Sequence, residues 1–237
     1  MKILVGIPIL NELGNIEPLI PQLLDLDNCI SILIIDDSPI SSELKIMEGD
    51  FPKDRFFFRH RSKRLGVGSA HQEIISFGTS NDFDCVVTMD GDGTHSSRDI
   101  PKLIQAIKYS DLVIGSRFVS GGDLRDWTFI RRLTTNTAHI ITKFATHTSL
   151  DCTSGIRAYN LKTTDYEKLL KELPSDYRFF YSSTFRLLAH NLEIHQIPVI
   201  LESRNLGKSK MSLKLATKLI VSLFFGSLGY RVKLAKK

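Results

Sequence analysis

Short apolar segments alternate with helical patterns through the first half of the chain, and this alternation limits the possible folds more than any other feature. The apolar segments are residues 2–9, 31–35, 56–59, 85–89 and 111–115. The segments with helical spacing are residues 16–24, with Asn15 as the expected N-cap, 69–77 and 98–109. Continuous apolar runs are typical of strands buried on both faces of a parallel sheet. The sequence therefore predicts an α/β fold, with a mostly parallel sheet and helices on both of its faces.

The predicted strand at residues 85–89 is followed by two carboxylates, Asp90 and Asp92, with glycines interleaved. Ligands of open α/β sheets bind outside the carboxyl ends of the strands. Carboxylate oxygens at that edge suit Mg²⁺, which shares its coordination with water and substrate phosphates, and they suit Mn²⁺ as well. An Asp-x-Asp pair also occurs in ordinary turns. A metal site and a simple turn are therefore both open at this point.

Two further polar segments follow predicted strands. Asp36 and Asp37 come directly after the second strand, where they either bind a ligand or cap a turn. The loop at residues 61–68 is basic and contains Gly66 and Gly68, which would let backbone amides approach an anion at the start of a helix. A solvated basic loop that only turns the chain explains the same residues.

The composition is that of a globular protein with an ordinary core. The chain has 237 residues, of which 42% are hydrophobic and 24% are charged. Its net charge of +5 fits an anionic partner, but it has no basic tract rich in aromatic residues, so we expect no nucleic-acid binding. Cys29, Cys85 and Cys152 are few and widely spaced, which favours a reducing, cytoplasmic compartment over a disulfide framework or a zinc site. The apolar N-terminus is short and is stopped by Pro8, so we expect a first strand rather than a signal peptide.

The second half of the chain alternates less regularly. The predicted elements are a helix at residues 128–145, a turn and short strand at 151–159, helices at 164–173 and 179–191, and a strand at 193–201. Residues 202–210 are polar and cationic, as in a mobile loop.

The C-terminal segment, residues 211–237, is predicted to form an amphipathic helix. The basic residues on one face are Lys210, Lys214 and Lys218. The apolar residues largely on another face are Leu215, Leu219, Ile220, Leu223 and Phe224. The apolar run from 219 to 230 is shorter than the roughly 20 residues that span a bilayer. This helix either lies in a membrane interface or packs on the core; we expect the first, and divide the chain into residues 1–210 and 211–237.

Six short motifs are spaced along residues 2–210. They are Pro8 with Asn11-Glu12, Asp36-Asp37-Ser38, and residues 64–70 (RLGVGSA), 89–92 (MDGD), 115–122 (GSRFVSGG) and 153–157 (TSGIR). In order and spacing they resemble the family 2 glycosyltransferases of the dolichol-phosphate or polyprenyl-phosphate mannosyltransferase type. The resemblance implies the Rossmann-like GT-A fold. It also implies transfer of a sugar from a nucleotide diphosphate donor, GDP-mannose or a UDP-hexose, to a polyprenyl phosphate lipid.

The resemblance further implies roles for individual residues. The donor-binding set is Pro8, Asn11, Glu12, Asp37, Gly68, Asp90 and Lys208. The implied ligands of Mg²⁺ or Mn²⁺ are Asp90 and Asp92. The set implied for the acceptor phosphate is Arg117, Arg131 and Thr135. The catalytic set is Asp90, Asp92, Arg117, Arg131 and Arg204, with Arg204 and Lys208 on the loop that would close over the donor phosphates.

The chain departs from the pattern of the family at two positions. Gly91 stands where alanine is common, and Thr94 stands where glutamine or serine often assists the metal, so we expect no third protein ligand. Many bacterial relatives carry membrane spans after the catalytic domain, and we expect none here. The enzyme is then expected to lie peripherally on the cytoplasmic face of a membrane.

A lipid phosphate acceptor needs no general base, because it is already an anion that Arg117 and Arg131 can orient beside C1 of the sugar. A single in-line displacement would invert that carbon. Two alternatives stay open. The first is a glycosyltransferase acting on a sugar hydroxyl in polysaccharide or glycan assembly, with Asp151 as the base; the second is a non-catalytic nucleotide-sugar-binding module. His95 would contact the metal or phosphate, or support the residues that do.

Overall fold

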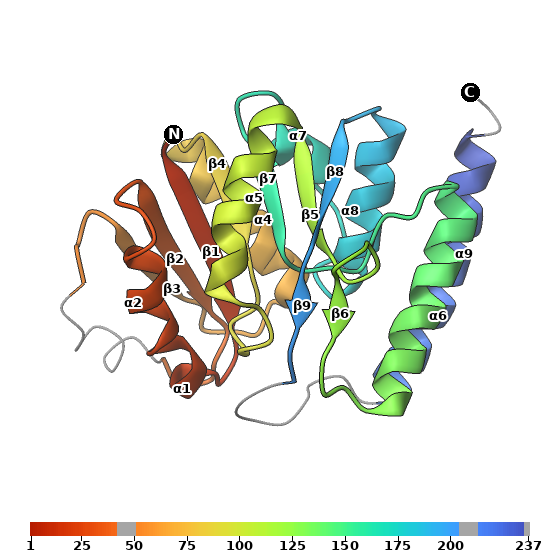
Figure 1. Ribbon diagram of the computed structural model, residues 1–237, viewed down its shortest axis with the longest axis horizontal. Coiled ribbons are helices and arrows are strands. Elements are labelled where there is room, and N and C mark those ends of the chain that lie inside the picture. Colours follow the sequence, from red (N-terminus) through yellow and green to blue (C-terminus); the bar gives the residue numbers. More distant parts are fainter. Residues whose placement is uncertain (42–50, 204–212, 235–237) are drawn as a thin grey trace.

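The computed structural model describes residues 1–41, 51–203 and 213–234 and shows a central sheet with helices on both faces (Figure 1). Within these residues the sheet has seven strands in the order β3-β2-β1-β4-β7-β5-β8. The strands are β1 (Ile3–Ile9), β2 (Ile30–Asp36), β3 (Phe56–His60), β4 (Cys85–Thr88), β5 (Leu112–Ser116), β7 (Arg157–Asn160) and β8 (Ile194–Pro198). All neighbours are parallel except that β7 runs antiparallel to β4 and β5. The predicted α/β fold is confirmed.

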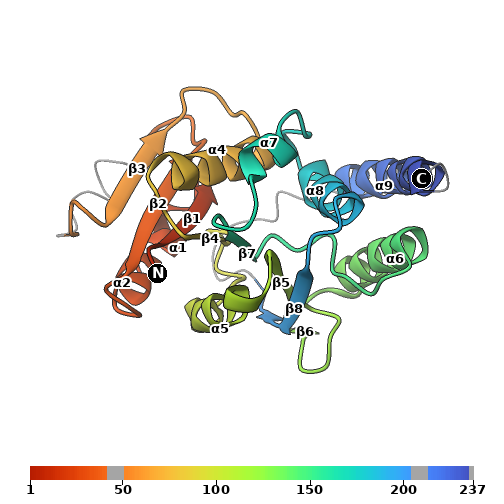
Figure 2. The same cartoon turned by 90° about the horizontal axis from the view of Figure 1, so that it is seen from above.

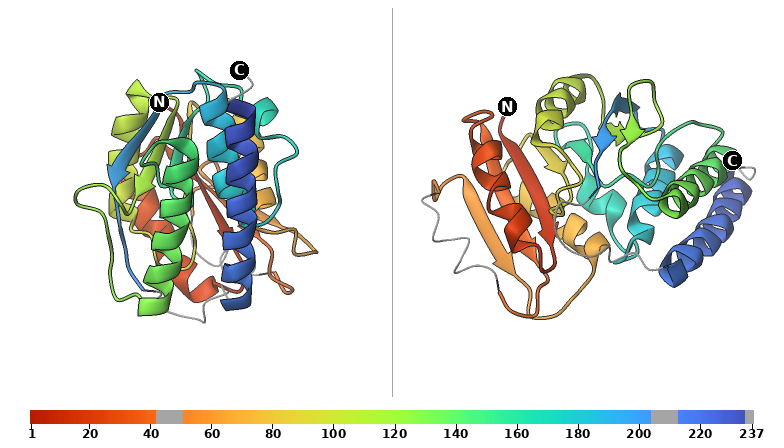
Figure 3. Two further views of the ribbon diagram at one scale, coloured as in Figure 1. Left: turned by 90° about the vertical axis from the view of Figure 1, so that its right-hand side faces the viewer. Right: turned by 60° about the horizontal axis from the view of Figure 1, so that its bottom comes forward.

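The helices form two layers and an additional pair. The α-helices of the described residues are α1 (Leu13–Ile16), α2 (Leu19–Leu24), α4 (Val67–Ser80), α5 (Ile100–Ala106), α6 (Phe129–Thr146), α7 (Tyr166–Leu170), α8 (Arg178–Ala189) and α9 (Leu213–Leu234). Figure 2 shows α2 and α5 on one face of the sheet and α4, α7 and α8 on the other. Helices α6 and α9 lie side by side beyond α8 (Figure 3). Two short strands, β6 (Asp123–Leu124) and β9 (Ile200–Leu201), pair beside the main sheet.

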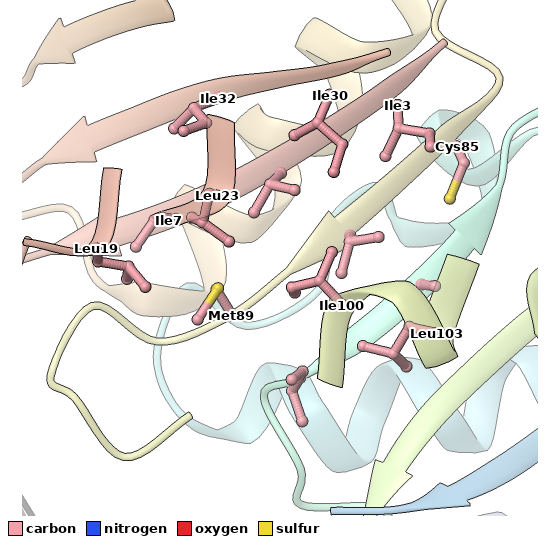
Figure 4. Packing of buried hydrophobic residues seen from close by; sticks show 14 of the residues in the cluster. Ile3, Ile7, Leu19, Leu23, Ile30, Ile32, Cys85, Met89, Ile100 and Leu103 are labelled. Atoms are coloured by element: carbon pink, nitrogen blue, oxygen red, sulfur yellow. The ribbon is translucent and has the colours of Figure 1, made fainter. Parts of the chain in front are cut away.

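Strand β1 contributes to two cores because it lies between β2 and β4 and is covered on both faces. The core that includes α2 and α5 contains Ile3, Ile7, Leu19, Leu23, Ile100 and Leu103 (Figure 4). On the opposite face Leu4 belongs to the core that contains Ile74 of α4. This arrangement explains why β1 is apolar without alternation, as strands covered on both sides are.

Prolines account for two places where an element differs from its prediction. The helix predicted at residues 16–24 starts earlier, at Leu13, so the prediction of Asn15 as its N-cap is wrong. Pro18, which has no backbone N–H to donate, lies between α1 and α2. The strand predicted at residues 193–201 is divided after Pro198, where the chain leaves the main sheet and β9 pairs with β6.

The helix predicted at residues 98–109 is α-helical only in α5, with a 3-10 turn at each end.

Helix α9 packs on the rest of the chain through one of its faces. Leu223 is 2% exposed and lies in a cluster with Tyr181 and Phe185 of α8. The prediction that Leu223 belongs to the membrane-facing side of the helix is therefore wrong. The large apolar side chains that α9 exposes are Val221, Phe224, Phe225 and Leu228. The predicted domain boundary at residue 210 lies outside the described residues. The helix therefore contacts the core and also presents an apolar face to the outside, and contact of that face with a membrane stays a prediction.

The structure also bears on the expected membrane spans and cysteine chemistry. Among residues 1–41, 51–203 and 213–234, no helix carries an apolar stretch long enough to cross a bilayer. The three cysteines are free thiols, with Cys29 exposed and the other two buried. Burial raises the pKa of the Cys85 and Cys152 thiols to about 12, so neither is a reactive thiolate.

The contact between β1 and α4 depends on Gly6, and its substitution tests the packing of the sheet. A β-carbon at Gly6 would lie 2.1 Å from Cγ2 of Ile74, which is fully buried. We expect Gly6→Ala to lower the free energy of unfolding by about 1–3 kcal/mol, because the core must be overpacked to accept it. Urea denaturation measures the change.

Two further variants make that measurement specific. The pair Gly6→Ala with Ile74→Ala should lose less stability than the sum of the two single losses, because the shorter side chain at residue 74 makes room for the added β-carbon. Gly14→Ala in α1, an exposed position, is the matched control and should change stability by less than about 1 kcal/mol. An unchanged midpoint for Gly6→Ala alone would contradict the described contact.

Candidate active site

The carboxyl ends of β1, β2, β4 and β5 open onto one cavity of about 800 Å³. The predicted site residues that line it are Pro8, Glu12, Asp37, Asp90, Asp92, Arg117, Arg131 and Thr135. Part of the remaining lining comes from α6, α8 and α9 and is mainly apolar, among it Ala138, Tyr181, Leu219, Ile220 and Leu223. The cavity therefore joins a charged region at the edge of the sheet to an apolar region where these three helices meet.

Of the other predicted site residues, two are described and do not line this cavity, Asn11 and Gly68. Arg204 and Lys208 lie outside the described residues. Asn11 is exposed, and its backbone N–H donates to Oγ of Ser38 at 2.8 Å, which holds the turn after β1. Gly68 lies under the segment before α8: a β-carbon there would lie 2.4 Å from the Pro174 carbonyl oxygen. The structure thus gives Gly68 a packing role, and its expected contact with the donor stays a prediction.

The two carboxylates after β4 are held differently. Asp92 is 5% exposed, and its Oδ1 accepts hydrogen bonds from the N–H of Thr94 at 3.0 Å and from the Thr94 hydroxyl at 2.7 Å. The Asp90 side chain is 37% exposed, so it is the more open of the two. Gly155 leaves room for it, because a β-carbon at this glycine would lie 3.1 Å from Oδ1 of Asp90. The turn that carries Gly155 is held by buried Arg157, which donates to the carbonyls of Ser154 and Cys152.

His95 holds the backbone of Asp90 through a hydrogen bond. Its Nδ1 accepts a hydrogen bond from the Asp90 backbone N–H at 2.8 Å, and it lies 3.9 Å from the Asp90 carboxylate. Burial lowers the pKa of His95 to about 4. The ring is therefore neutral near pH 7, with its proton on Nε2, and it holds the backbone of Asp90 without competing for the carboxylate as a cation.

The donor set of this region fits a hard divalent cation. Asp90 and Asp92 supply carboxylate oxygens that line the cavity, which is the chemistry that Mg²⁺ and Mn²⁺ prefer. Within the described part of the chain, no group of three or more His, Cys, Asp or Glu side chains could hold a metal. Because the Thr94 hydroxyl is already bonded to Asp92, the residues present agree with a metal that takes its remaining ligands from substrate and water.

Asp37 is fixed by the basic loop that follows β3. Its Oδ1 accepts from Nε of Arg61 at 2.6 Å, and its Oδ2 accepts from the N–H of Gly66 at 3.1 Å. Gly66 has a φ of +94°, and no side chain could fit there because a β-carbon would lie 2.5 Å from the Ser175 carbonyl oxygen. The anion that the Gly66 amide holds is thus the Asp37 carboxylate, and this contact anchors the loop to the end of β2.

Arg117 and Asp151 form a buried ion pair. Nε of Arg117 donates to one carboxylate oxygen at 2.7 Å and Nη2 donates to the other at 2.5 Å, while Nη2 also donates to the Thr153 hydroxyl. Burial by itself would raise the pKa of the Asp151 carboxyl, but the charge of Arg117 and its hydrogen bonds outweigh burial and lower that pKa. Asp151 is 1% exposed and does not line the cavity, so it is poorly placed to act as a general base.

Helix α6 brings Arg131 and Thr135 to the cavity one turn apart. The helix begins after Thr128, whose hydroxyl accepts from the Arg131 N–H. Cζ of Arg131 lies 3.6 Å from the centre of the Trp127 ring. Trp127 lines the cavity too, and it is not among the site residues predicted from the sequence. The sequence offers a signal for Trp127, because it is the one tryptophan of the chain and stands four residues before Arg131.

The buried pair of Arg117 and Asp151 predicts a measurable pH dependence of stability. A carboxyl whose pKa is lowered on folding stabilises the protein above its unfolded pKa of about 3.9, and this stabilisation is lost as the pH falls through the lowered value. We expect Asp151→Asn to cost about 3–5 kcal/mol near pH 7, because Arg117 would stay buried without its partner. Urea unfolding at a series of pH values measures both effects.

The variant should also lose less stability than the parent protein between pH 4 and lower pH, since the titrating group is gone. Asp126→Asn is the matched control: Asp126 is exposed with a φ of +55° that asparagine tolerates, and its change should stay within about 0.5 kcal/mol. Parallel pH profiles for the parent and Asp151→Asn would contradict the assignment.

Comparison with known proteins places this geometry in a family. Residues 4–173 match the sequence model of glycosyl transferase family 2. The chain is 30% identical over 219 residues to the polyprenol monophosphomannose synthase of Mycolicibacterium smegmatis, covering 89% of this chain and 81% of the relative. It is 29% identical over 230 residues to the undecaprenyl-phosphate mannosyltransferase of Micrococcus luteus, covering 94% and 93%.

A solved structure shows the same fold. The glucosyl-3-phosphoglycerate synthase of Mycobacterium tuberculosis, in complex with Mn²⁺, UDP and glucosyl-3-phosphoglycerate, superposes with a TM-score of 0.67 at 19% identity, covering 97% of this chain and 79% of that one. At this identity the likeness concerns the fold alone, which is the GT-A fold expected from the motifs. With the fold, the family match and the curated relatives in agreement, the chain belongs to glycosyl transferase family 2 and is a glycosyltransferase.

Proposed function

We propose that this enzyme transfers a sugar from a nucleotide diphosphate donor to a polyprenyl phosphate. The observation that carries the proposal is the single cavity that joins the carboxylates at the edge of the sheet to an apolar region between α6, α8 and α9. A lipid phosphate has the two matching parts, a charged head and an apolar chain. The names of the relatives from Mycolicibacterium smegmatis and Micrococcus luteus support this acceptor and favour mannose as the sugar.

On the donor side, Pro8, Glu12 and Asp37 would hold the nucleotide, and Asp90 and Asp92 would hold the divalent cation on the diphosphate. When bound, that cation supplies Lewis-acid stabilisation of the negative charge that develops on the leaving diphosphate. His95 keeps the backbone of Asp90 in place, and the Thr94 hydroxyl keeps the Asp92 carboxylate in place. Donor carboxylates that are already oriented need no reorganisation during the reaction. Arg204 and Lys208 stay proposed contacts to the donor phosphates.

On the acceptor side, Arg131 and Thr135 would bind the phosphate of the lipid. Arg117 lines the same cavity while its pair with Asp151 fixes its orientation, so it would position the phosphate with less net charge than an unpaired arginine. The phosphate oxygen then attacks C1 of the sugar as an anion, and no protein base is needed. Direct displacement of this kind inverts the configuration at C1.

The runner-up is transfer to a sugar hydroxyl, which would need a general base. Asp151 was the candidate, and its burial and its bidentate bonds to Arg117 favour a positioning role instead. A free sugar acceptor is polar and does not match the apolar part of the cavity. Both observations support the phosphate acceptor over the hydroxyl acceptor.

The activity is tested with purified protein, Mg²⁺ or Mn²⁺, labelled GDP-mannose or UDP-hexoses and a polyprenyl phosphate. We expect a glycolipid product from at least one donor. Asp90→Asn and Asp92→Asn should each lower its formation by about a hundredfold or more, because the charge stabilisation by the metal is worth several kcal/mol. Arg131→Gln should mainly raise the KM for the lipid phosphate.

The control for that series is Arg125→Gln, an exposed arginine close to Arg131 in sequence that does not line the cavity. Its kinetics should match those of the parent enzyme. Absence of glycolipid across the donor panel would overturn the proposed acceptor class, and near-normal KM in Arg131→Gln would remove Arg131 from the acceptor site.

The outer face of α6 and α9 supports association with a membrane surface. Its exposed apolar side chains are Phe129, Leu133, Ile140 and Phe144 of α6 and Val221, Phe224, Phe225 and Leu228 of α9. Neither helix contains an acidic residue, and Arg132, Lys143 and Lys218 are exposed on them. Apolar side chains flanked by lysine and arginine suit an anionic bilayer surface. We propose that this face docks on the membrane that supplies the lipid.

Vesicle flotation tests the docking. The double change Phe224→Ser with Phe225→Ser should lower the partition onto vesicles of phosphatidylcholine and phosphatidylglycerol by about tenfold or more, because two exposed aromatic side chains no longer enter the bilayer. Removal of residues 211–237 is a poorer test, since it would also remove Leu223 and uncover Tyr181 and Phe185, against which Leu223 packs.

Ile40→Ser is the matched control, because Ile40 is 85% exposed and lies far from α6 and α9 in the sequence. It should float like the parent protein. Binding should also weaken in high salt, as basic residues at anionic headgroups require. Equal flotation of the double variant and the parent would contradict docking through this face.

A further inference from the structure

Trp127 contacts two parts of the candidate site that are distant in sequence. Its ring lies under the Arg131 guanidinium, with Cζ 3.6 Å from the ring centre. Its Nε1–H donates to the carbonyl oxygen of Glu202 at 3.1 Å. The backbone N–H of Glu202 donates in turn to the carbonyl oxygen of Thr94 at 3.2 Å, and Thr94 holds Asp92. One series of contacts thus runs from the carboxylate loop to Arg131.

The stacking geometry explains what the indole does for Arg131. The guanidinium is planar, and its N–H donors point outwards in that plane. Stacking on a ring occupies the flat side of the group and keeps the donors directed sideways, where phosphate oxygens can meet them. Because a long arginine side chain otherwise samples many rotamers, a ring beneath it reduces the ordering needed when a phosphate binds.

The hydrogen bond to Glu202 explains how the indole itself is held. Trp127 is half-buried and packs against the core that contains β1, so its ring has support on one side. The bond from Nε1 fixes the rotation of the ring. Glu202 follows β9, and its two backbone groups are bonded to Trp127 and Thr94, so the start of α6 and the carboxylate loop share one backbone anchor.

We propose that Trp127 is a positioning residue for glycosyl transfer: it holds Arg131 ready for the acceptor phosphate and ties α6 to the loop that carries Asp92. The inference rests on the proposed function, since Arg131 is the residue proposed to bind that phosphate. A residue that only fills space would affect stability and leave the kinetics of the folded enzyme unchanged. A positioning residue acts on the KM of the acceptor more than on kcat.

The first test needs no substrate. Trp127 is the one tryptophan of the chain, so its fluorescence reports on this position alone. Arg131→Gln should change the emission of Trp127 and increase its quenching by acrylamide, because the guanidinium no longer covers the ring. Arg125→Gln should leave both unchanged. Equal quenching of the parent and Arg131→Gln would overturn the proposal.

The second test separates the two contacts by steady-state kinetics. Trp127→Leu removes both the aromatic face and the Nε1 donor, and should raise the KM for polyprenyl phosphate about five- to thirtyfold while kcat falls less. Trp127→Phe keeps an aromatic face without the donor, and should raise that KM about two- to tenfold. It also serves if the leucine variant fails to fold. An unchanged acceptor KM in folded Trp127→Leu, or in Trp127→Phe where the leucine variant does not fold, would overturn the proposal.

A double-mutant cycle shows whether Trp127 acts through Arg131. The variant with both Trp127→Leu and Arg131→Gln should have an acceptor KM close to that of Arg131→Gln alone. Once Arg131 is replaced, the stacking contact is already lost, and replacing Trp127 removes nothing further from the phosphate site. Additive effects would overturn the proposed route through Arg131. If the parent enzyme transfers no sugar to polyprenyl phosphate, the proposed function itself fails and this role fails with it. An active parent with unaffected Trp127 variants removes only the role of Trp127.

Discussion

The parallel pairing of β1 with β2 and β4 is the constraint on which the rest of the structure depends. β1 can hold this central position because it is apolar towards both cores. The register pairs Ile9 with Asp36 and Gly6 with Thr88, so β2 and β4 end at the same edge of the sheet. The residues just beyond, Asp37 and Asp90, therefore line one cavity. A slip of one residue would turn the side chains of a strand to the opposite face and separate these groups.

Carboxylates gathered at that edge are stable because each is held by donors. Asp37 is bound by Arg61 and the Gly66 amide, and Asp151 is bound by Arg117. Buried charge without such partners would be costly. The same contacts decide the chemistry of the site, because a carboxylate that already has a cation beside it is a weak base. Asp90 stays more open than the rest, which suits the ion that links protein and donor in the proposed reaction.

Helices α6 and α9 combine two surfaces that a single amphipathic helix would not provide. Their inner faces line the apolar part of the cavity, and their outer faces expose aromatic and aliphatic side chains. A polyprenyl chain that left a membrane between such helices would stay in an apolar environment as its phosphate reached Arg131. Trp127, at the entry to α6, lies where the acceptor side meets the anchor of the carboxylate loop. The proposed docking surface, acceptor region and metal site are thus joined through one helix.

The sequence by itself determined the α/β fold, the family and eight of the residues that line the cavity, because apolar period and motif order are local properties. It did not determine that Arg117 is paired with Asp151 or that Gly68 is covered by the segment before α8, since both depend on residues distant in the chain. For the apolar face that contains Leu223, the sequence favoured a membrane interface over packing on the core. In the tertiary structure Leu223 packs against Tyr181 and Phe185 and is buried in the core. The sequence does not decide this, because the hydrophobic effect is non-directional and does not specify which apolar surroundings bury a side chain.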